Sequence, residues 1–371
     1  MFLVVLFSCF KWLCYDWSSK ADHRFVHSSN ALTSITPPVL HRNNDHSMIV
    51  PLQLLVVLAT TTYNAMASAS PPENGKSTVL KDNDNSAEQC VVDVDLSAVT
   101  ETALWTLQNR AIVALDSSKE WFQDDKAVEI YSSINYDYKA SFGKPDEGSG
   151  IRSWLFDQHI LDFWRTHPEG TVVNFAEGLE TQRFRLEESR PLGTLWITVD
   201  LPPAIKAREH FILPSDENLH VATSVLETGE WMHLVPRDKP VFFTAQGLFM
   251  YLNEKDLRGL LQEIANEFPS STILFDSISK RLSDKAMSPN GWKLTDTYKT
   301  PPMPFGANKD KAQGVFQSWV PNAKVEEVPW PLKKASGFFM QYVAPYLIRL
   351  PMIQNLVPGM VMKMEFPPST K

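Results

Sequence analysis

The sequence predicts a doubly wound α/β fold, in which a mostly parallel sheet is covered by helices on both faces. Short apolar runs rich in β-branched and aromatic residues recur between residues 171 and 276, and segments with helical periodicity alternate with them. This alternation is typical of parallel strands that are joined by crossover helices and buried on both faces. With 371 residues, of which 43% are hydrophobic, the chain is long enough to bury a large core.

The expected strands and helices follow from these patterns. We predict five strands, at TVVNFA, TLWITVD, LHVATS, PVFFTA and STILFD, with helices near residues 202–211 and 254–268. A helix near 308–319, an apolar helical stretch near 335–347 and a last strand at GMVMKMEF complete the chain. The corresponding expectation for the body is a helical N-terminal cap at 96–168, a sheet at 169–278 and 320–367, and a loop-rich insertion at 279–310.

Residues 1–95 differ from this body. They hold two apolar runs, each shorter than the roughly 20 residues that span a bilayer. The second run follows Met48 and precedes small residues, as in a signal peptide, but no Lys or Arg lies between Met48 and the run. We expect either a targeting or anchoring extension, with membrane contact only through residues 1–66, or translation that starts at Met48 or Met66 after untranslated or disordered residues.

Composition argues against two classes of partner. The net charge of −8 and the lack of a dense Lys/Arg cluster argue against a nucleic-acid binder. All three cysteines, Cys9, Cys14 and Cys90, precede the body, and the nine histidines show no HxxxH or HExxH spacing. We therefore expect no disulfide framework in the body and no bound metal.

The stretch VVNFAEGLETQRFRL indicates a site at the end of the first strand. Ala176, Glu177 and Gly178 form the predicted turn between strand and helix, and Gly178 would allow close approach of a ligand to the backbone. A glycine at this place is also found where strand and helix merely pack. In an open α/β sheet, however, ligands bind at the carboxyl ends of the strands.

Asp200 strengthens this interpretation. It ends the second strand, and its spacing along the sequence from the turn is close to that of the acidic residue that binds the ribose hydroxyls in adenosine cofactors. The run AEGLET lacks the GxGxxG pattern of a pyrophosphate site, so a cofactor without phosphates fits better. S-adenosylmethionine has this character. Arg152 and Arg183 are candidate cations for its carboxylate, although either arginine could be a solvated surface residue.

The fourth strand ends in TAQGLFMYL. Small residues keep the strand end open, and Phe249, Met250 and Tyr251 could form the wall of an aromatic or apolar substrate site. Packing at the entry of a helix explains the same residues equally well.

Taken together, IRSWLFDQHILDF, VVNFAEGLETQRFRL, VDLPPAIKAR, AQGLFMYL and ILFDSIS resemble the leucine carboxyl methyltransferase family, and most closely its polyketide-synthesis O-methyltransferase branch. The resemblance covers about residues 98–367. It implies a class I S-adenosylmethionine-dependent methyltransferase with a helical cap and a lid-like insertion after the fifth strand. MPFG in the insertion and MKMEF near the end also resemble this branch.

The resemblance also implies roles for single residues. Arg152 would hold the cofactor carboxylate, Gly178 would line the methionine part and Asp200 would hold the ribose. The chain departs from the family pattern at four positions. Ala176 stands where the family commonly has glycine, Glu180 and Ser224 where it commonly has aspartate, and Gln246 where it commonly has glutamate. Asp157 or Tyr251 could orient or deprotonate an acceptor hydroxyl.

Three functions remain open from the sequence. The first is methyl transfer to a hydroxyl or carboxyl oxygen of a small polyketide-like or aromatic molecule. The second is methylation of a protein C-terminal carboxylate, and the third is a non-catalytic protein that kept the fold. A cytoplasmic or organellar location is favoured, because secretion would remove the enzyme from the cytosolic cofactor supply. The oligomeric state is not predicted.

Overall fold

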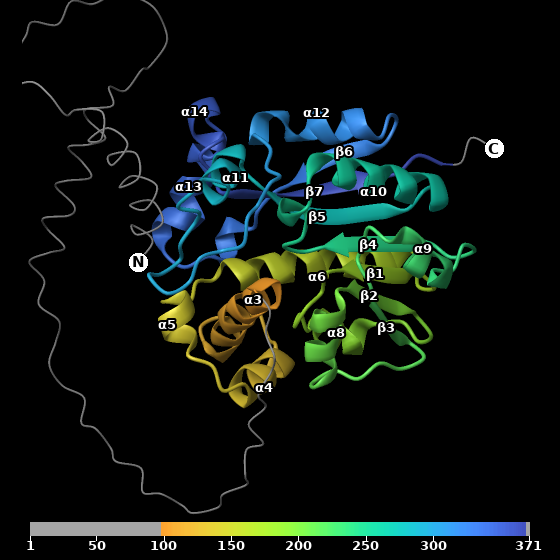
Figure 1. The fold of residues 1–371 in the computed structure, drawn as a ribbon, viewed down its shortest axis with the longest axis horizontal. Coiled ribbons are helices and arrows are strands. Elements are labelled where there is room, and N and C mark those ends of the chain that lie inside the picture. Colours follow the sequence, from red (N-terminus) through yellow and green to blue (C-terminus); the bar gives the residue numbers. More distant parts are fainter. Residues whose placement is uncertain (1–97, 369–371) are drawn as a thin grey trace, which may run out of the picture. The chain divides into compact units, whose positions relative to one another are not determined.

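A seven-stranded sheet forms the centre of the protein in its computed structural model, which describes residues 98–368 (Figure 1). The strand order is β3-β2-β1-β4-β5-β7-β6, and only β7 runs antiparallel to its neighbours. This arrangement confirms the predicted mostly parallel, doubly wound sheet. The predicted extension, residues 1–95, lies outside the described residues.

The strands have short, well-defined bounds. They are β1 (Thr171–Phe175), β2 (Trp196–Asp200), β3 (Asn218–Ala222), β4 (Val241–Ala245), β5 (Thr272–Ile278), β6 (Lys324–Val328) and β7 (Gly359–Glu365). Because β1 pairs in parallel with both β2 and β4, the carboxyl ends of these three strands meet at one edge of the sheet.

Helices precede, separate and follow these strands. The α-helices are α3 (Ala98–Leu115), α4 (Asp125–Ser133), α5 (Tyr138–Phe142), α6 (Gly148–Thr166), α7 (Gln182–Arg185), α8 (Pro202–Glu209), α9 (Thr228–Trp231), α10 (Glu254–Glu267), α11 (Lys280–Ala286), α12 (Lys309–Trp319), α13 (Ala344–Leu347) and α14 (Pro351–Gln354). Five short helical turns complete them: the 3-10 helices η1 (Glu187–Ser189), η2 (Met232–Leu234), η3 (Phe249–Tyr251) and η4 (Leu332–Lys334), and the π-helix η5 (Phe339–Val343).

Alternate side chains of each strand pack against different helices. Val172 and Phe242 face a cluster with residues of α6, whereas Val173 and Phe243 face a cluster with residues of α10 and α12. Successive side chains of a strand point to opposite faces of the sheet. Because β1 and β4 are buried at every position, helices must cover both faces, and these are the helices seen on either side of the sheet in Figure 1.

The helices α3 and α4, which lie within the predicted N-terminal cap, pack on the turn after β1 and on α8. A buried apolar cluster joins Leu104 and Leu107 of α3 to Ile130 of α4, to Leu179 in the turn after β1 and to Ala207 of α8. The cap therefore touches the turn where the sequence predicts a cofactor site.

Three elements differ from the sequence prediction. The edge strand β6 was missed because KVEEV holds mostly charged residues, which an edge strand tolerates on its solvent-facing positions. The helix α11 was missed within the insertion 279–310, and α6 begins at Gly148, inside the Gly- and Pro-containing run SFGKPDEGSG, whose composition is typical of a loop. Within residues 98–368 no helix combines the length and the apolar character needed to cross a bilayer.

Candidate active site at the carboxyl ends of β1, β2 and β4

The turn after β1 has a left-handed backbone at two positions. Both Ala176 and Gly178 have φ of 52°. Glycine adopts this conformation freely, whereas an alanine pays about 1–2 kcal/mol for it. The turn also packs closely on the cap, because a Cβ atom at position 178 would lie 3.3 Å from the side chain of Ala103. Glycine at 178 therefore suits both the conformation and the close packing of the turn.

Asp200 joins the end of β2 to this turn. Its Oδ2 atom accepts a hydrogen bond from the backbone N–H of Gly178 at 2.8 Å, and its Oδ1 atom accepts one from Leu201 at 2.7 Å. Burial raises the pKa of Asp200 to about 6, and the two backbone hydrogen bonds oppose this rise. The carboxylate of Asp200, which the sequence predicts as a ribose ligand, therefore lies at the C-terminal end of β2, directly beside Gly178.

Two buried arginines hold the carbonyl groups of the turn. Arg208 of α8 donates to the carbonyl oxygen of Gly178 at 2.8 Å and to that of Glu180 at 2.7 Å. Arg110 of α3 donates to the carbonyl oxygen of Leu179 at 2.7 Å. Three successive carbonyls are thus fixed from two sides, by side chains that come from different helices.

The side chain of Glu177 points into the same arrangement. Its Oε2 atom pairs with Arg208 at 3.2 Å and also accepts hydrogen bonds from Thr198 and Trp196 of β2. Both Glu177 and Arg208 are buried. The Oε1 atom of Glu177 has no hydrogen-bond partner among residues 98–368, so we propose a structural role for Oε2 alone.

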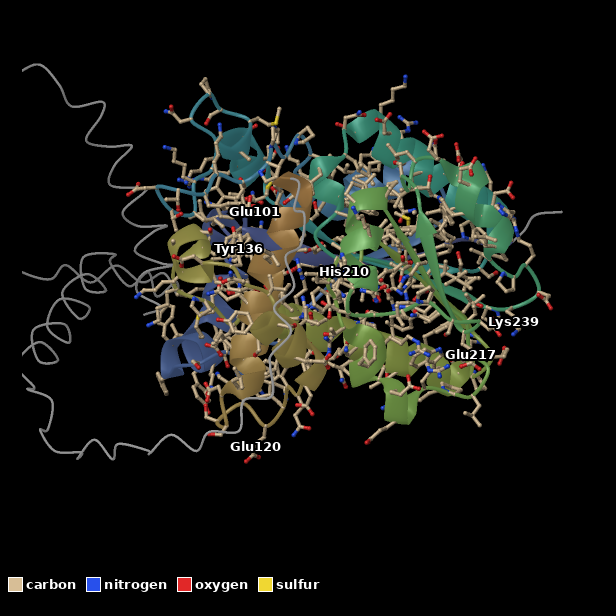
Figure 2. All side chains as sticks on the ribbon, turned by 60° about the horizontal axis from the view of Figure 1, so that its bottom comes forward. Glu101, Glu120, Tyr136, His210, Glu217 and Lys239 are labelled. Carbon is tan, nitrogen blue, oxygen red and sulfur yellow. The ribbon has the colours of Figure 1, made fainter. Side chains whose placement is uncertain are left out.

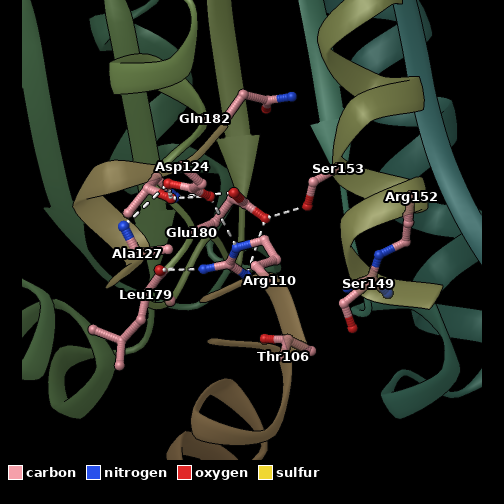
Figure 3. Close-up of polar contacts among 12 residues, drawn as sticks. Thr106, Arg110, Asp124, Ala127, Ser149, Arg152, Ser153, Leu179, Glu180 and Gln182 are labelled. Atoms are coloured by element: carbon pink, nitrogen blue, oxygen red, sulfur yellow. Dashed lines mark hydrogen bonds and ion pairs between the residues drawn. The ribbon is translucent and has the colours of Figure 1, made fainter. Parts of the chain in front are cut away.

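Below the turn, buried charges form an ion-pair network (Figure 3). Arg110 pairs with Glu180 at 3.2 Å and with Asp124 at 3.5 Å, and Glu180 also accepts from Ser153 at 2.8 Å. Arg185 contacts Glu180 and Asp124 at 2.6 Å each. Although burial raises the pKa of Glu180, the charges of both arginines hold it well below its usual range. The longer Glu180, where the family commonly has aspartate, thus reaches two guanidinium groups.

Asp157 belongs to this network. Its two oxygens accept hydrogen bonds from Gln182 at 2.7 Å and from Arg185 at 2.8 and 3.0 Å. Burial raises the pKa of Asp157, and the Arg185 charge opposes the rise. We propose that Asp157 positions Arg185, in place of the acceptor-orienting role expected from the sequence.

On the other side of the turn, Arg152 and Asp276 meet at the end of β4. Arg152 of α6 pairs with Oδ2 of Asp276 at 2.7 Å, and Oδ1 of Asp276 accepts from the backbone N–H of Gly247 at 2.6 Å. Nε of Arg152 and Oε1 of the neighbouring Gln246 are buried without a hydrogen-bond partner among residues 98–368. A free donor and a free acceptor thus remain at this edge.

The remaining predicted cofactor residues, Ser224 and Arg183, have local partners. The Ser224 hydroxyl accepts from the backbone N–H of Leu226 at 3.2 Å, and the preceding Thr223 donates its N–H to the carbonyl of Asp200, which places Ser224 next to the end of β2. Arg183 instead pairs with Glu187 at 3.5 Å. Within the described part of the chain, no contact joins Arg183 to Arg152 or Asp200, and Nε of Arg183, like that of Arg152, is buried without a hydrogen-bond partner.

Tyr251 lies in η3, directly after the β4 end. Burial raises the pKa of its phenol to about 12, and a hydrogen bond with the Thr102 side chain of the cap acts in the opposite direction. At neutral pH the phenol therefore keeps its proton. Tyr251 can donate a hydrogen bond to a substrate, but it is a poor proton acceptor.

An aromatic wall surrounds Tyr251. Trp292 and Met303 of the insertion belong to the same apolar cluster as Tyr251, and the ring of Trp292 meets that of Trp105 of α3 edge-on, with 6.1 Å between centroids. In the cap itself, the hydroxyl of Tyr136 donates to Glu101, and the two side chains lie together in Figure 2. The cap, η3 and the insertion therefore meet beside the carboxyl edge of the sheet.

Sequence reasoning missed Arg110, Arg208 and Asp276. The only local signal was a charge at a position that the helical pattern makes apolar, as for Arg110 in ALWTLQNRAIVAL. The partners of these residues lie far along the chain, so their contacts could not be read from local spacing.

Comparison with known proteins gives a consistent picture. The sequence profile of the leucine carboxyl methyltransferase family matches residues 98–265. The tetracenomycin polyketide synthesis O-methyltransferase TcmP of Streptomyces glaucescens is 30% identical over 189 residues, which cover 50% of this chain and 68% of that protein.

Solved structures with a similar fold include two plantazolicin methyltransferases. BamL, in complex with a triazolic desmethylPZN analog and SAH, is 11% identical with a TM-score of 0.41, and the match covers 73% of this chain and 100% of that one. BpumL, in complex with SAH, is also 11% identical with a TM-score of 0.39, over 72% and 99%. Scores this low support no conclusion about substrate or site.

Proposed function

The chain belongs to the leucine carboxyl methyltransferase family and is an S-adenosylmethionine-dependent O-methyltransferase, and we propose that its acceptor is a small polyketide-like or aromatic molecule. The observation that carries the site assignment is the hydrogen bond between Asp200 and Gly178, at the edge where β1 and β2 end. The proposed acceptor follows from the similarity to TcmP and from the aromatic wall around Tyr251.

The residues at this edge fit S-adenosylmethionine. Asp200 is a buried carboxylate whose oxygens retain lone pairs for the two ribose hydroxyls. The free Nε–H of Arg152 suits a carboxylate, and the free Oε1 of Gln246 suits an ammonium group. We propose that these three side chains, with the Gly178 backbone, hold the cofactor.

Methyl transfer from a sulfonium depends mainly on alignment of the two reactants and less on general acid–base catalysis by the protein. When bound, S-adenosylmethionine would supply an electrophilic methyl group, carried on a sulfonium, to the acceptor oxygen. Correct alignment of the two reactants can contribute on the order of 7–11 kcal/mol to such a step. The fixed turn and the aromatic wall would provide this alignment.

The need for a base depends on the acceptor. A carboxylate is already nucleophilic at neutral pH, whereas a phenol must lose its proton. Because Tyr251 keeps its own proton, we propose that it orients the acceptor oxygen by donating a hydrogen bond, rather than removing a proton.

A second candidate acceptor is a peptide C-terminal carboxylate, which the name of the family suggests. The aromatic wall favours the small molecule, because it consists of buried and half-buried apolar side chains from the cap and the insertion. A peptide chain would also bring backbone polar groups that need partners.

A transfer assay distinguishes the two acceptors. The purified chain is incubated with S-adenosylmethionine labelled in its methyl group and with a panel of phenols, aromatic carboxylic acids and a peptide that ends in leucine. We expect label in one or more of the small molecules. Label in the peptide alone would support the second acceptor and contradict the first.

A further inference from the structure

An aromatic strip lies exposed on the segment before β7. We define it as Phe338, Phe339, Tyr342, Tyr346 and Leu350, and each of these side chains is exposed to solvent; Phe338 is 73% and Tyr346 70% exposed. We propose that this strip is a membrane-docking surface that binds an anionic lipid bilayer. The proposal is independent of the acceptor that the enzyme methylates.

The strip is a continuous face of a helical stretch. Phe338, Tyr342 and Tyr346 follow one another at intervals of four residues from the N-cap of η5 into α13, so their side chains fall on one side of the stretch, and Leu350 follows shortly after α13. The rings of Phe338 and Tyr342 lie against each other, with centroids 4.9 Å apart. The opposite side is anchored in the protein by Ala335 and Ala344, which are buried.

The charge around the strip suits an anionic surface. Between Glu327 and Glu365 the sequence has no acidic residue, although the whole chain carries a net charge of −8. The basic residues in this interval are Lys333, Lys334, Arg349 and Lys363, of which Lys333 and Arg349 are exposed on either side of the strip. Exposed aromatic and aliphatic side chains with flanking Lys or Arg are typical of segments that lie in a membrane interface.

The segment lies at the substrate side of the protein. The N–H of Ser336 donates to Glu147, which precedes α6, and Nζ of Lys334 lies 4.6 Å from the ring centroid of Trp154. At its other end, the N–H of Ser279, just after β5, donates to the carbonyl of Pro358. Figure 1 likewise shows α13 and α14 beside α11, at the end of the sheet that carries the proposed site.

A lipid bilayer explains these features better than a second protein copy. The segment between Glu327 and Glu365, which has basic but no acidic residues, repels the same segment of a second copy but is attracted to anionic headgroups. Tyrosine also suits the interface between headgroups and acyl chains, because its ring is apolar while its hydroxyl can stay in water, and phenylalanine adds apolar contact area. Membrane contact was expected from the sequence only through residues 1–66, and the aromatic strip would add a second point of contact.

The test is sedimentation of the full chain with vesicles of phosphatidylcholine, with and without phosphatidylserine. We expect the wild type to bind more tightly when phosphatidylserine is present. The double variant Phe338→Ser with Tyr342→Ser should bind about tenfold more weakly to both, since it loses apolar contact area. Lys333→Glu with Arg349→Glu should lose about tenfold or more on phosphatidylserine vesicles only, because each basic residue contributes there through charge.

The matched control removes two exposed leucines elsewhere. Leu192 is 98% and Leu213 75% exposed, and their joint change to serine should leave vesicle binding unaltered. All variants keep residues 1–97, so any contribution of that region is the same in each. Unchanged thermal unfolding and unchanged S-adenosylmethionine affinity would show that the strip variants keep the fold and the cofactor site.

Three results would overturn the proposal. Equal vesicle binding by the strip variant and the wild type would show that the strip does not touch lipid. Light scattering that finds a wild-type dimer and a monomeric strip variant would assign the strip to a second copy. A strip variant that keeps vesicle binding but transfers methyl groups more slowly to a water-soluble acceptor would assign the strip to the acceptor site.

Discussion

The carboxylate of Asp200 lies 2.8 Å from the backbone nitrogen of Gly178, although 22 residues separate them in the chain. This contact ties the end of β2 to the turn after β1. The same turn is held from below by Arg110 and Arg208, which bind its carbonyl oxygens. The proposed cofactor edge is therefore a fixed surface of the fold, built by side chains from several elements.

Ala176→Gly should stabilise the protein. Ala176 occupies a left-handed conformation that costs alanine about 1–2 kcal/mol, and glycine would relieve most of this cost while losing some chain entropy. We expect the free energy of unfolding, measured with urea, to rise by about 0.5–1 kcal/mol. The matched control is Ala114→Gly near the C-terminal end of α3, which should lower the free energy of unfolding by up to about 1 kcal/mol. A loss of stability on Ala176→Gly would contradict the assigned strain.

Arg208→Met should strongly destabilise the protein. The change leaves the buried carboxylate of Glu177 and two turn carbonyls without this partner, and breaking a buried pair in this way costs about 3–5 kcal/mol. The measurement is urea denaturation.

Arg237→Met is the control for this change. Arg237 pairs with Glu267 at 2.6 Å, but both side chains are about half exposed. Its loss should change the free energy of unfolding by about 0–1 kcal/mol. Equal effects of the two substitutions would show that the Arg208 contacts do not hold the turn.

Tyr251→Phe should reduce methyl transfer only modestly. Because the pKa of Tyr251 is raised to about 12, the phenol is protonated at neutral pH and its loss removes one hydrogen-bond donor. We expect kcat to fall less than about tenfold, as for a neutral hydrogen bond, with an unchanged shape of the pH–rate profile. Disappearance of a basic limb from that profile would instead identify Tyr251 as a proton acceptor.

Cofactor affinity should fall as the pH drops below about 6. The pKa of Asp200 is raised to about 6 by burial, so the carboxylate that would accept from the ribose hydroxyls becomes protonated in this range. The raised pKa also affects stability. Above pH 6, the ionised carboxylate of Asp200 lowers the free energy of unfolding, and this loss is recovered as the pH falls from about 6 towards the pKa of 3.8 that the group has in the unfolded chain. Calorimetric titrations of the wild type with S-adenosylmethionine at about pH 5 to about pH 8, a range that includes this pKa, should show the fall in cofactor affinity.

Asp200→Asn provides the comparison for the pH series. The amide does not titrate, so the affinity of this variant should be weaker at neutral pH and independent of Asp200 ionisation. A wild-type affinity that stays flat below pH 6, the region set by the pKa of about 6, would remove Asp200 from the ribose contact.

The sequence predicted the sheet well because its strands are apolar on both faces. VVNF, ITV and VFFT need helices on two sides, and this requirement alone determines the layers. The edge strand β6 escaped prediction because its charged residues face solvent, and α11 escaped because it is a short helix directly after β5, within a region that otherwise forms loops.

Prediction of the site was less complete for a physical reason. Gly178 and Asp200 could be paired because parallel neighbouring strands bring their carboxyl ends together. Arg110 and Arg208 reach the turn from the sides of two helices, across 69 and 30 residues of sequence, and no local pattern indicates this. Arg183 stays a candidate cation: its Nη1 atom pairs with the nearby Glu187, whereas its Nε atom has no partner among the described residues.

Calorimetric titration of wild type and Asp200→Ala with S-adenosylmethionine tests the central claim most directly. We predict micromolar binding by the wild type and at least about a tenfold loss in the variant, since hydrogen bonds to a charged group contribute about 1.5–3 kcal/mol. Unchanged unfolding of the variant would exclude a general loss of structure. Binding of the cofactor by Asp200→Ala as tightly as by the wild type would contradict the assignment of this edge as the cofactor site.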